Sequence, residues 1–178
     1  HEVKVILTIS SQANTLPSSL QLWADYIYLD TDERRRFAQV SHEYLIEQLQ
    51  YQSGGSAETS RELNFNHPVK ELIWTGGRTE SSGTLGSLGS GNYYLKLNGH
   101  DRFSARDLKY FTRTQVWQHH TGPGGINGNA SAGVGNLVDQ IAVYSFALKP
   151  EEHQPSGTCN FSRIDNAQLH SPNTQLDV

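Results

Sequence analysis

The sequence predicts an all-β fold, a β-sandwich of short strands joined by polar loops, and three observations support this prediction. Charged residues make up 18% of the 178 residues, below the roughly 25% of a typical soluble domain. Gly, Ser, Asn, Gln and Thr take their place, whereas a helical bundle needs Glu, Lys and Arg on its helix surfaces. Short apolar segments, several of them alternating with polar residues, recur along the chain with turn-forming residues between them.

In the N-terminal part of the chain, the sequence predicts two strands followed by one short helix. Residues 3–9 (VKVILTI) are β-branched and apolar, which is typical of a buried strand, and residues 20–30 alternate between two faces. A helix is expected near 32–40, because Thr31 or Asp32 can serve as its N-cap and acidic side chains occupy its first turn.

The best candidate for a domain boundary follows this helix. Residues 42–51 can continue the apolar stripe of the helix or alternate as a strand, and we prefer the strand. Residues 52–59 (QSGGSAET) are rich in Gly and Ser, a composition typical of a flexible linker. The sequence therefore predicts that one domain ends near residue 51 and that another begins near residue 60.

Beyond this linker, short strands and two Gly-rich loops alternate. The segments with strand-like composition are residues 62–65, 70–75, 92–97, 110–118 and 138–148. His67 precedes a proline and is therefore expected to be extended, and the pair Asn98 and Gly99 predicts a hairpin turn. Long loops are expected at 76–91 and 121–135.

The glycines and acids that invite a ligand-binding interpretation do not complete a motif. Residues 86–91 carry three glycines, but no Lys-Ser/Thr pair follows them and no helix is predicted there, so the context of a phosphate-binding loop is missing. Asp30 and Asp32 resemble the opening of a calcium loop, but Arg35 and Ser41 stand where that loop needs Gly and Glu.

Histidine and cysteine predict neither a metal site nor a catalytic site. His119 and His120 are adjacent, and neighbouring side chains on a strand point to opposite faces, so the pair alone cannot chelate a metal. Cys159 is the single cysteine, so no intrachain disulfide forms, and a half-buried, packed thiol is expected. No G-x-S-x-G nucleophile elbow is present. The sequence thus predicts no cofactor, no metal and no small-molecule substrate.

Charge and surface motifs limit the partners further. The formal net charge of −4 argues against direct binding of nucleic acid. No apolar run approaches the roughly 20 residues of a membrane-spanning helix. Asn129 and Asn160 each begin an N-x-S pattern, the acceptor pattern for N-glycosylation in proteins that enter the secretory pathway.

Four segments resemble a known family. Residues 141–166, IAVYSFALKPEEHQPSGTCNFSRIDN, resemble a signature of the major capsid proteins of nucleocytoplasmic large DNA viruses, especially those of algal viruses and iridoviruses. Residues 24–50, residues 64–74 (NFNHPVKELIW) and residues 117–120 (WQHH) resemble other parts of the same proteins, in the same order along the chain.

The resemblance implies a double jelly roll. Residues 1–51 are then the C-terminal strands and short helix of the first jelly roll, residues 52–59 the linker, and residues 60–178 the second jelly roll. That second jelly roll is expected to be incomplete at its C-terminal end, with residues 168–178 beginning a connection to a further strand.

The resemblance also implies a structural role without catalysis. Three subunits of such proteins form a pseudo-hexagonal capsomer of an icosahedral shell. The implied partners are two further copies of the chain, neighbouring capsomers and minor capsid proteins, with no direct contact to nucleic acid. The implied location is the virion capsid, after synthesis in the host cytoplasm.

A carbohydrate-binding β-sandwich module is the alternative function. Such a module would present exposed aromatic side chains to a sugar, and the candidates are Trp23, Trp74, Trp117 and the pair Tyr93 and Tyr94. All of these lie within strand-like patterns, which favours packing in the core over exposure.

Overall fold

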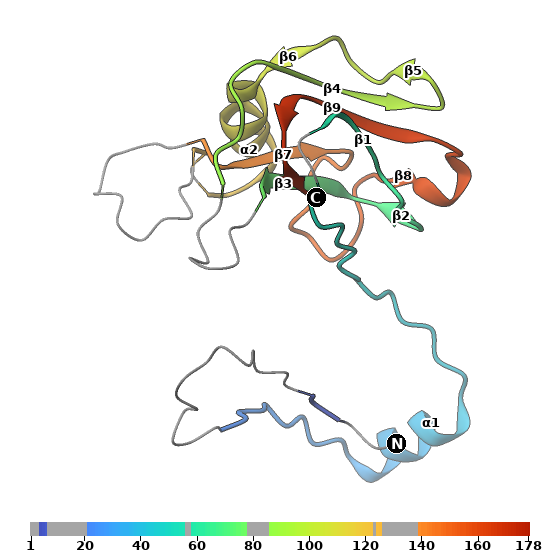
Figure 1. Ribbon diagram of the computed structural model, residues 1–178. Coiled ribbons are helices and arrows are strands. Elements are labelled where there is room, and N and C mark those ends of the chain that lie inside the picture. The colour runs from blue at the N-terminus through green and yellow to red at the C-terminus, as the bar shows by residue number, and fades with distance from the viewer. Residues whose placement is uncertain (1–3, 7–20, 56–57, 78–85, 123, 126–138) are drawn as a thin grey trace. The chain divides into compact units, whose positions relative to one another are not determined.

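The computed structural model describes residues 4–6, 21–55, 58–77, 86–122, 124–125 and 139–178 (Figure 1). The chain divides into two compact units, His1–Leu45 (unit 1) and Ile46–Val178 (unit 2). Among the helices formed by the described residues, none is long and apolar enough to cross a membrane.

Unit 1 contains the predicted helix, α1, at Thr31–Gln39. Asp30 is its N-cap, in place of the predicted Thr31 or Asp32, because Asp30 has an extended backbone and its carboxylate accepts a hydrogen bond from the Thr31 amide at 2.7 Å. Acidic Asp32 in the first turn and basic Arg36 in the last turn suit the helix dipole.

The other segments predicted as strands in this part of the chain form no strand among their described residues. The described residues of 20–30 and 42–51 lie in no strand, and only 4–6 of the predicted strand 3–9 are described, also outside any strand. Trp23, Ile27 and Tyr28 are each more than four-fifths exposed. A strand requires a regular ladder of backbone hydrogen bonds to a neighbour, and the sheets formed by the described residues include none of these segments.

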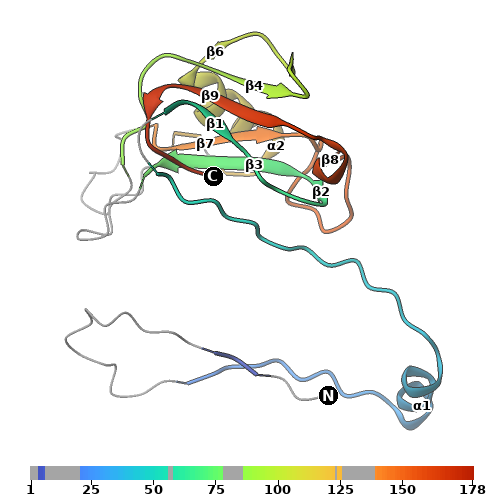
Figure 2. The ribbon, with the colours of Figure 1, turned by 45° about the vertical axis from the view of Figure 1, so that its right-hand side comes forward.

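Unit 2 is a β-sandwich built from antiparallel ladders (Figures 1 and 2). One sheet contains, in spatial order, β1 (Glu58–Glu62), β9 (Ala167–Thr174), β4 (Asn92–Leu97) and β5 (His100–Asp101), with β6 (Arg106–Asp107) also paired to β4. The second sheet contains β10 (Leu176–Asp177), β3 (Glu71–Gly76) and β7 (Ile141–Ser145), and β2 (Pro68–Val69) pairs with β8 (Cys159–Asn160).

The core lies between the two sheets and is rich in aromatic rings. Trp74 on β3, Tyr93 on β4 and Phe111 contact one another, with ring centroids 5.2 to 6.2 Å apart, and each is at most 1% exposed. Leu95 and Leu169 pack beside them from the first sheet. Burial of each such side chain contributes on the order of 2–3 kcal/mol relative to exposure, so this cluster is the main apolar source of stability.

The segment 110–118 is helical, so the predicted strand is wrong. It forms a π-helical turn, Tyr110–Thr114, followed by α2, Gln115–His119. The buried side chains of this region recur at helical spacing: Leu108, Phe111, Thr112, Gln115 and Val116. Two of these five side chains are polar, so the spacing of the apolar residues alone does not show the helical period.

The predicted hairpin turn at Asn98 and Gly99 is confirmed, whereas the extended conformation predicted for His67 is wrong. Asn98 and Gly99 have φ of 51° and 79° and connect β4 to β5, as the predicted hairpin requires. His67 has φ of 68° and is not extended. Its amide donates to Ser162 Oγ at 2.8 Å and its carbonyl accepts from the Phe161 amide at 3.0 Å, and these two bonds hold the turn against the preference of a residue before proline.

The C-terminal residues are strands and not a connection, which corrects the prediction for residues 168–178. They form most of β9, which lies between β1 and β4, and then β10, which pairs with β3. Residues 62–65 contribute only Glu62 to β1, because this strand begins earlier, at Glu58. Most of the two Gly-rich loops lies outside the described residues.

Candidate functional site

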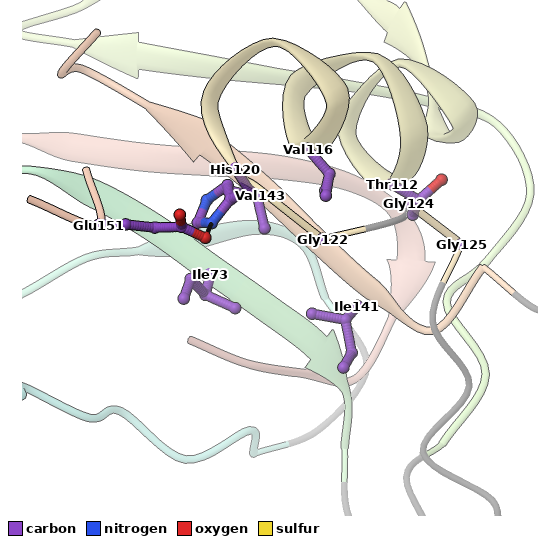
Figure 3. Close-up of a pocket in the computed structure, with 10 residues that line it drawn as sticks. All are labelled: Ile73, Thr112, Val116, His120, Gly122, Gly124, Gly125, Ile141, Val143 and Glu151. Atoms are coloured by element: carbon purple, nitrogen blue, oxygen red, sulfur yellow. Dashed lines mark hydrogen bonds and ion pairs between the residues drawn. The ribbon is translucent and has the colours of Figure 1, made fainter. Parts of the chain in front are cut away.

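A polar network stands where α2 ends. His120 is the C-cap of α2 and has an extended backbone, so its ring leaves the helix axis and lies between two carboxylates. Nε2 is 2.9 Å from Glu71 on β3. Nδ1 is 3.1 Å from Glu151 in the loop after β7, and Figure 3 shows these two side chains. Each ring nitrogen of His120 thus contacts a different carboxylate. The network therefore joins a helix end, a sheet and a loop.

Glu151 is also held by the residue after His120. The amide and the hydroxyl of Thr121 donate to its carboxylate, the hydroxyl at 2.9 Å. The backbone hydrogen bond from Thr121 is the main cause that lowers the pKa of Glu151, with the Thr121 hydroxyl and His120 adding to it. This carboxylate is therefore ionised at neutral pH.

A small hollow of about 230 Å³ lies beside this network, and its floor is apolar (Figure 3). Ile73 of β3, Ile141 and Val143 of β7 and Val116 of α2 line it together with Thr112, His120, Glu151 and glycines of the following loop. The hydroxyl of Thr112 in this lining is buried and donates to the carboxylate of Asp139, so it is engaged in a contact that holds the helical segment to the start of β7.

Two large apolar side chains are exposed near the end of α2. Trp117 is 79% exposed and Leu148 is 72% exposed. The segments that carry them are in contact, because Nδ1 of His119 lies 3.0 Å from the carbonyl of Leu148. Exposed apolar side chains close together are typical of protein contact surfaces.

The predicted sugar-binding aromatics separate into different environments. Trp74 and Tyr93 are buried in the core, as the strand pattern predicted for them. Tyr94 stacks on His170 with centroids 4.3 Å apart. Of these aromatics only Trp23 and Trp117 are strongly exposed, so the predicted core packing is wrong for these two. They belong to different units. No group of these aromatics within unit 2 therefore forms an open platform for a sugar.

The histidines and the cysteine are used in separate contacts. No group of three or more His, Cys, Asp or Glu side chains that could hold a metal exists in the part of the chain that the structure describes. His119 and His120 face different partners, and burial lowers the pKa of His170. Cys159 packs against the core, and burial raises the pKa of its thiol, so the reactive thiolate is disfavoured.

One of the two N-x-S acceptor residues can be placed. Asn160 is exposed on β8, and its side-chain oxygen accepts a hydrogen bond from the Ser162 amide at 3.1 Å, which caps the short 3-10 helix Phe161–Arg163. Asn129 lies outside the described residues. Glycosylation at either residue stays a prediction.

Asp139 and Arg113 form an ion pair with two hydrogen bonds. Arg113 donates twice to the carboxylate, at 2.9 and 3.0 Å, and the hydroxyl of Thr112 donates at 2.7 Å. The hydrogen bond from Arg113 is the first cause that lowers the pKa of Asp139. The pair fixes the start of β7 on the helical segment.

This ion pair predicts an acid-dependent loss of stability. Because the pKa of Asp139 is lower in the folded protein than the roughly 3.9 of an unfolded chain, its stabilisation is complete above that value and is lost as pH falls through the folded pKa. Asp139→Asn should lower the free energy of unfolding at pH 7 by on the order of 1 kcal/mol, since Arg113 is partly exposed.

Urea unfolding of both proteins between pH 7 and pH 2.5 measures the effect. The difference between wild type and Asp139→Asn should shrink as the pH falls, because protonation removes the charge that the variant lacks. A difference that stays constant over this range contradicts the assignment.

Comparison with known proteins identifies relatives along nearly the whole chain. Residues 33–88 and 89–175 match the family of large eukaryotic DNA virus major capsid proteins. The major capsid protein of Pyramimonas orientalis virus is 48% identical over 200 aligned positions, which cover 99% of this chain and 49% of that protein. The major capsid protein of Paramecium bursaria Chlorella virus 1 is 38% identical, with 95% of this chain and 48% of that protein covered.

The fold has solved relatives too. A chain of the PBCV-1 virus capsid, in a quasi-atomic model, superimposes with a TM-score of 0.61 at 34% identity, covering 85% of this chain and 43% of that chain. The predicted all-β jelly-roll sandwich is confirmed by this match. The chain spans about half the length of the curated relatives that it matches.

Proposed function

This chain belongs to the major capsid proteins of large eukaryotic DNA viruses, and we propose that it acts as a structural subunit of a viral shell. The observation that carries the proposal is the match to capsid proteins over nearly the whole chain. The described residues agree with a structural role, because their polar groups hold elements together and their exposed apolar side chains suit protein contacts. The role in the shell requires no catalysis, cofactor or metal.

The proposed assembly is a homotrimer that forms a pseudo-hexagonal capsomer of an icosahedral capsid. Its further partners are neighbouring capsomers and minor capsid proteins, and it makes no direct contact with nucleic acid. The protein would be synthesised in the host cytoplasm and would reside in the virion. The net charge of −4 supports the absence of a nucleic-acid surface.

The proposed domains are the C-terminal end of a first jelly roll at residues 1–51, a linker at 52–59 and a second jelly roll at 60–178. Support for the first comes from unit 1, where residues 21–30 carry apolar side chains that are exposed and a backbone outside any strand. Such segments gain a buried face and hydrogen-bond partners when the remaining strands of a jelly roll lie beside them.

The trimer is tested by mass in solution. The protein, expressed at the full length of its relatives, should sediment in analytical ultracentrifugation with three times the mass of its chain, and its particles should have hexagonal outlines in electron micrographs. A protein that stays monomeric at every concentration would contradict the proposal. Binding of sugar by that monomer would favour the carbohydrate-binding module.

A further inference from the structure

Residues 47–54 lie along unit 2 as an extended segment, which we call the strap. Its backbone pairs with the end of the chain: the Gln52 amide donates to the Val178 carbonyl at 2.8 Å, and the Val178 amide donates to the Gln52 carbonyl at 3.0 Å. This is the pattern of an antiparallel ladder. Through this residue pair the strap is held to the end of the chain, directly after β10.

Two glutamine side chains of the strap bind the end of β1 and the residues that follow it. The Gln50 amide group donates to the Asn66 carbonyl at 2.5 Å and accepts from the Asn66 amide at 2.8 Å. The Gln52 amide group donates to the Glu62 carbonyl at 2.8 Å and accepts from the Asn64 amide at 3.1 Å. Each primary amide thus makes the two hydrogen bonds that a peptide group of a neighbouring strand would make.

Further contacts hold the strap at both ends. At its start, Lys70 donates to the carboxylate of Glu47. At its end, Gln175 donates to the carbonyl of Gly54 at 3.0 Å, and the Gly54 amide donates to the carboxylate of Asp177. Between them, Arg61 donates to the Ser53 carbonyl at 3.3 Å.

The strap consequently joins the two sheets along one side of the sandwich. Its backbone pairs with Val178, directly after β10, while its glutamines bind residues 62–66, which continue from β1 of the other sheet. Both of these edges would otherwise offer free backbone groups to other chains. Its residues 52–54, which have the composition of a flexible linker, are held in place by these contacts.

We propose that Gln50 and Gln52 are positioning residues that hold the strap in a single register on unit 2 and so fix the path by which the chain enters this unit. A slip of one residue would turn both glutamine side chains away from residues 62–66, because successive side chains of an extended segment point to opposite faces. The consequence for assembly rests on the proposed function: a closed trimer needs the same geometry in every copy.

The test compares Gln50→Ala/Gln52→Ala with the control Gln48→Ala in the protein expressed at the full length of its relatives. Gln48 is an exposed glutamine of the same segment. Hydrogen exchange of the Asn64 and Asn66 amides should accelerate about fivefold to tenfold in the double variant, as expected for the loss of a hydrogen bond of about 1 kcal/mol. The control should exchange as the wild type does.

The second measurement is the mass distribution in analytical ultracentrifugation. The double variant should give a broad mixture of species at a melting temperature near that of the control, because the register is lost while the core is intact. Unchanged exchange at Asn64 and Asn66 overturns the inference about the strap. Accelerated exchange with a uniform trimer overturns the positioning role. A wild-type protein that forms no trimer refutes the proposed capsomer instead, and the exchange measurement still decides the role of the strap.

Discussion

Replacing Trp74 by alanine is expected to lower the free energy of unfolding by about 3–5 kcal/mol, the largest effect of any single substitution considered. Trp74 is 1% exposed and contacts Tyr93 and Phe111, so its removal leaves a cavity between the two sheets. Because the surrounding strands are paired on both sides of β3, they can collapse into this cavity only in part. Urea unfolding monitored by circular dichroism measures the loss.

Trp117→Ala is the matched control for this prediction. The same atoms are removed from a side chain that is 79% exposed, so the free energy of unfolding should change by no more than about 0.5 kcal/mol. Equal losses in the two variants would show that the sandwich core is not where the structure places it. Trp74→Phe adds a finer test: it keeps most of the ring and removes an indole N–H that has no partner among the described residues, so it should cost much less than alanine.

Gly54→Ala is expected to have the second largest effect, a loss of about 1–3 kcal/mol in the free energy of unfolding. A Cβ atom at this position would lie 2.5 Å from the carbonyl oxygen of Leu176 and 2.9 Å from the carboxylate of Asp177. The first of these is backbone of β10, which β3 and the strap hold between them, so the strap must move away. Amide exchange at Gln52 and Val178 should accelerate together with the loss of stability.

Gly55→Ala provides the comparison one residue later. A Cβ atom at Gly55 would have no atom within 4 Å, and the backbone there is not in the left-handed region. Alanine should therefore be neutral or should stabilise the protein by up to about 1 kcal/mol, because it reduces the conformational entropy of the unfolded chain. If Gly54→Ala is as stable as Gly55→Ala, the close approach of strap and β10 is refuted.

Strands with an alternating pattern and a buried partner could be predicted from the sequence. Residues 92–97 coincide with β4, and the predicted strand 138–148 contains β7. The short helix α1 was predicted because its acidic first turn is a local signal. In each case the information lies within a few residues of the element itself.

Segments whose structure depends on distant partners were predicted wrongly. Thr112 and Gln115 are polar yet buried, because each has a hydrogen-bond partner some thirty residues later. Thr112 donates to the carboxylate of Asp139, and Gln115 accepts from the amide of Ser145. Their polarity therefore hid the helix at 110–119. His67 adopts its turn through Phe161 and Ser162, again far along the chain. No local pattern carries such information.

The contacts of the candidate site could not be predicted either, because they too join residues that are distant in sequence. The sequence shows His120 as half of a histidine pair within the segment 117–120, whereas its partners in the structure, Glu71 and Glu151, are 49 and 31 residues away. Residues 62–65 were predicted as a strand, and nothing in the sequence indicated that glutamine side chains of the strap would bind residues 62–66. Charge and spacing identify residue types, but the contacts depend on topology.

The pairing of β1 with β9 has a consequence for how the protein folds during synthesis. Glu62 pairs with Gln168 and Glu58 with Thr174, so the central strand of the first sheet is translated more than a hundred residues after its neighbour. Contacts this distant in sequence are slow to form, because the entropy of closing a long loop is lost before the strand pairing contributes any stabilisation. The nascent sandwich stays open until residue 174 has left the ribosome, and it is during this interval that a chaperone has the most apolar surface to protect.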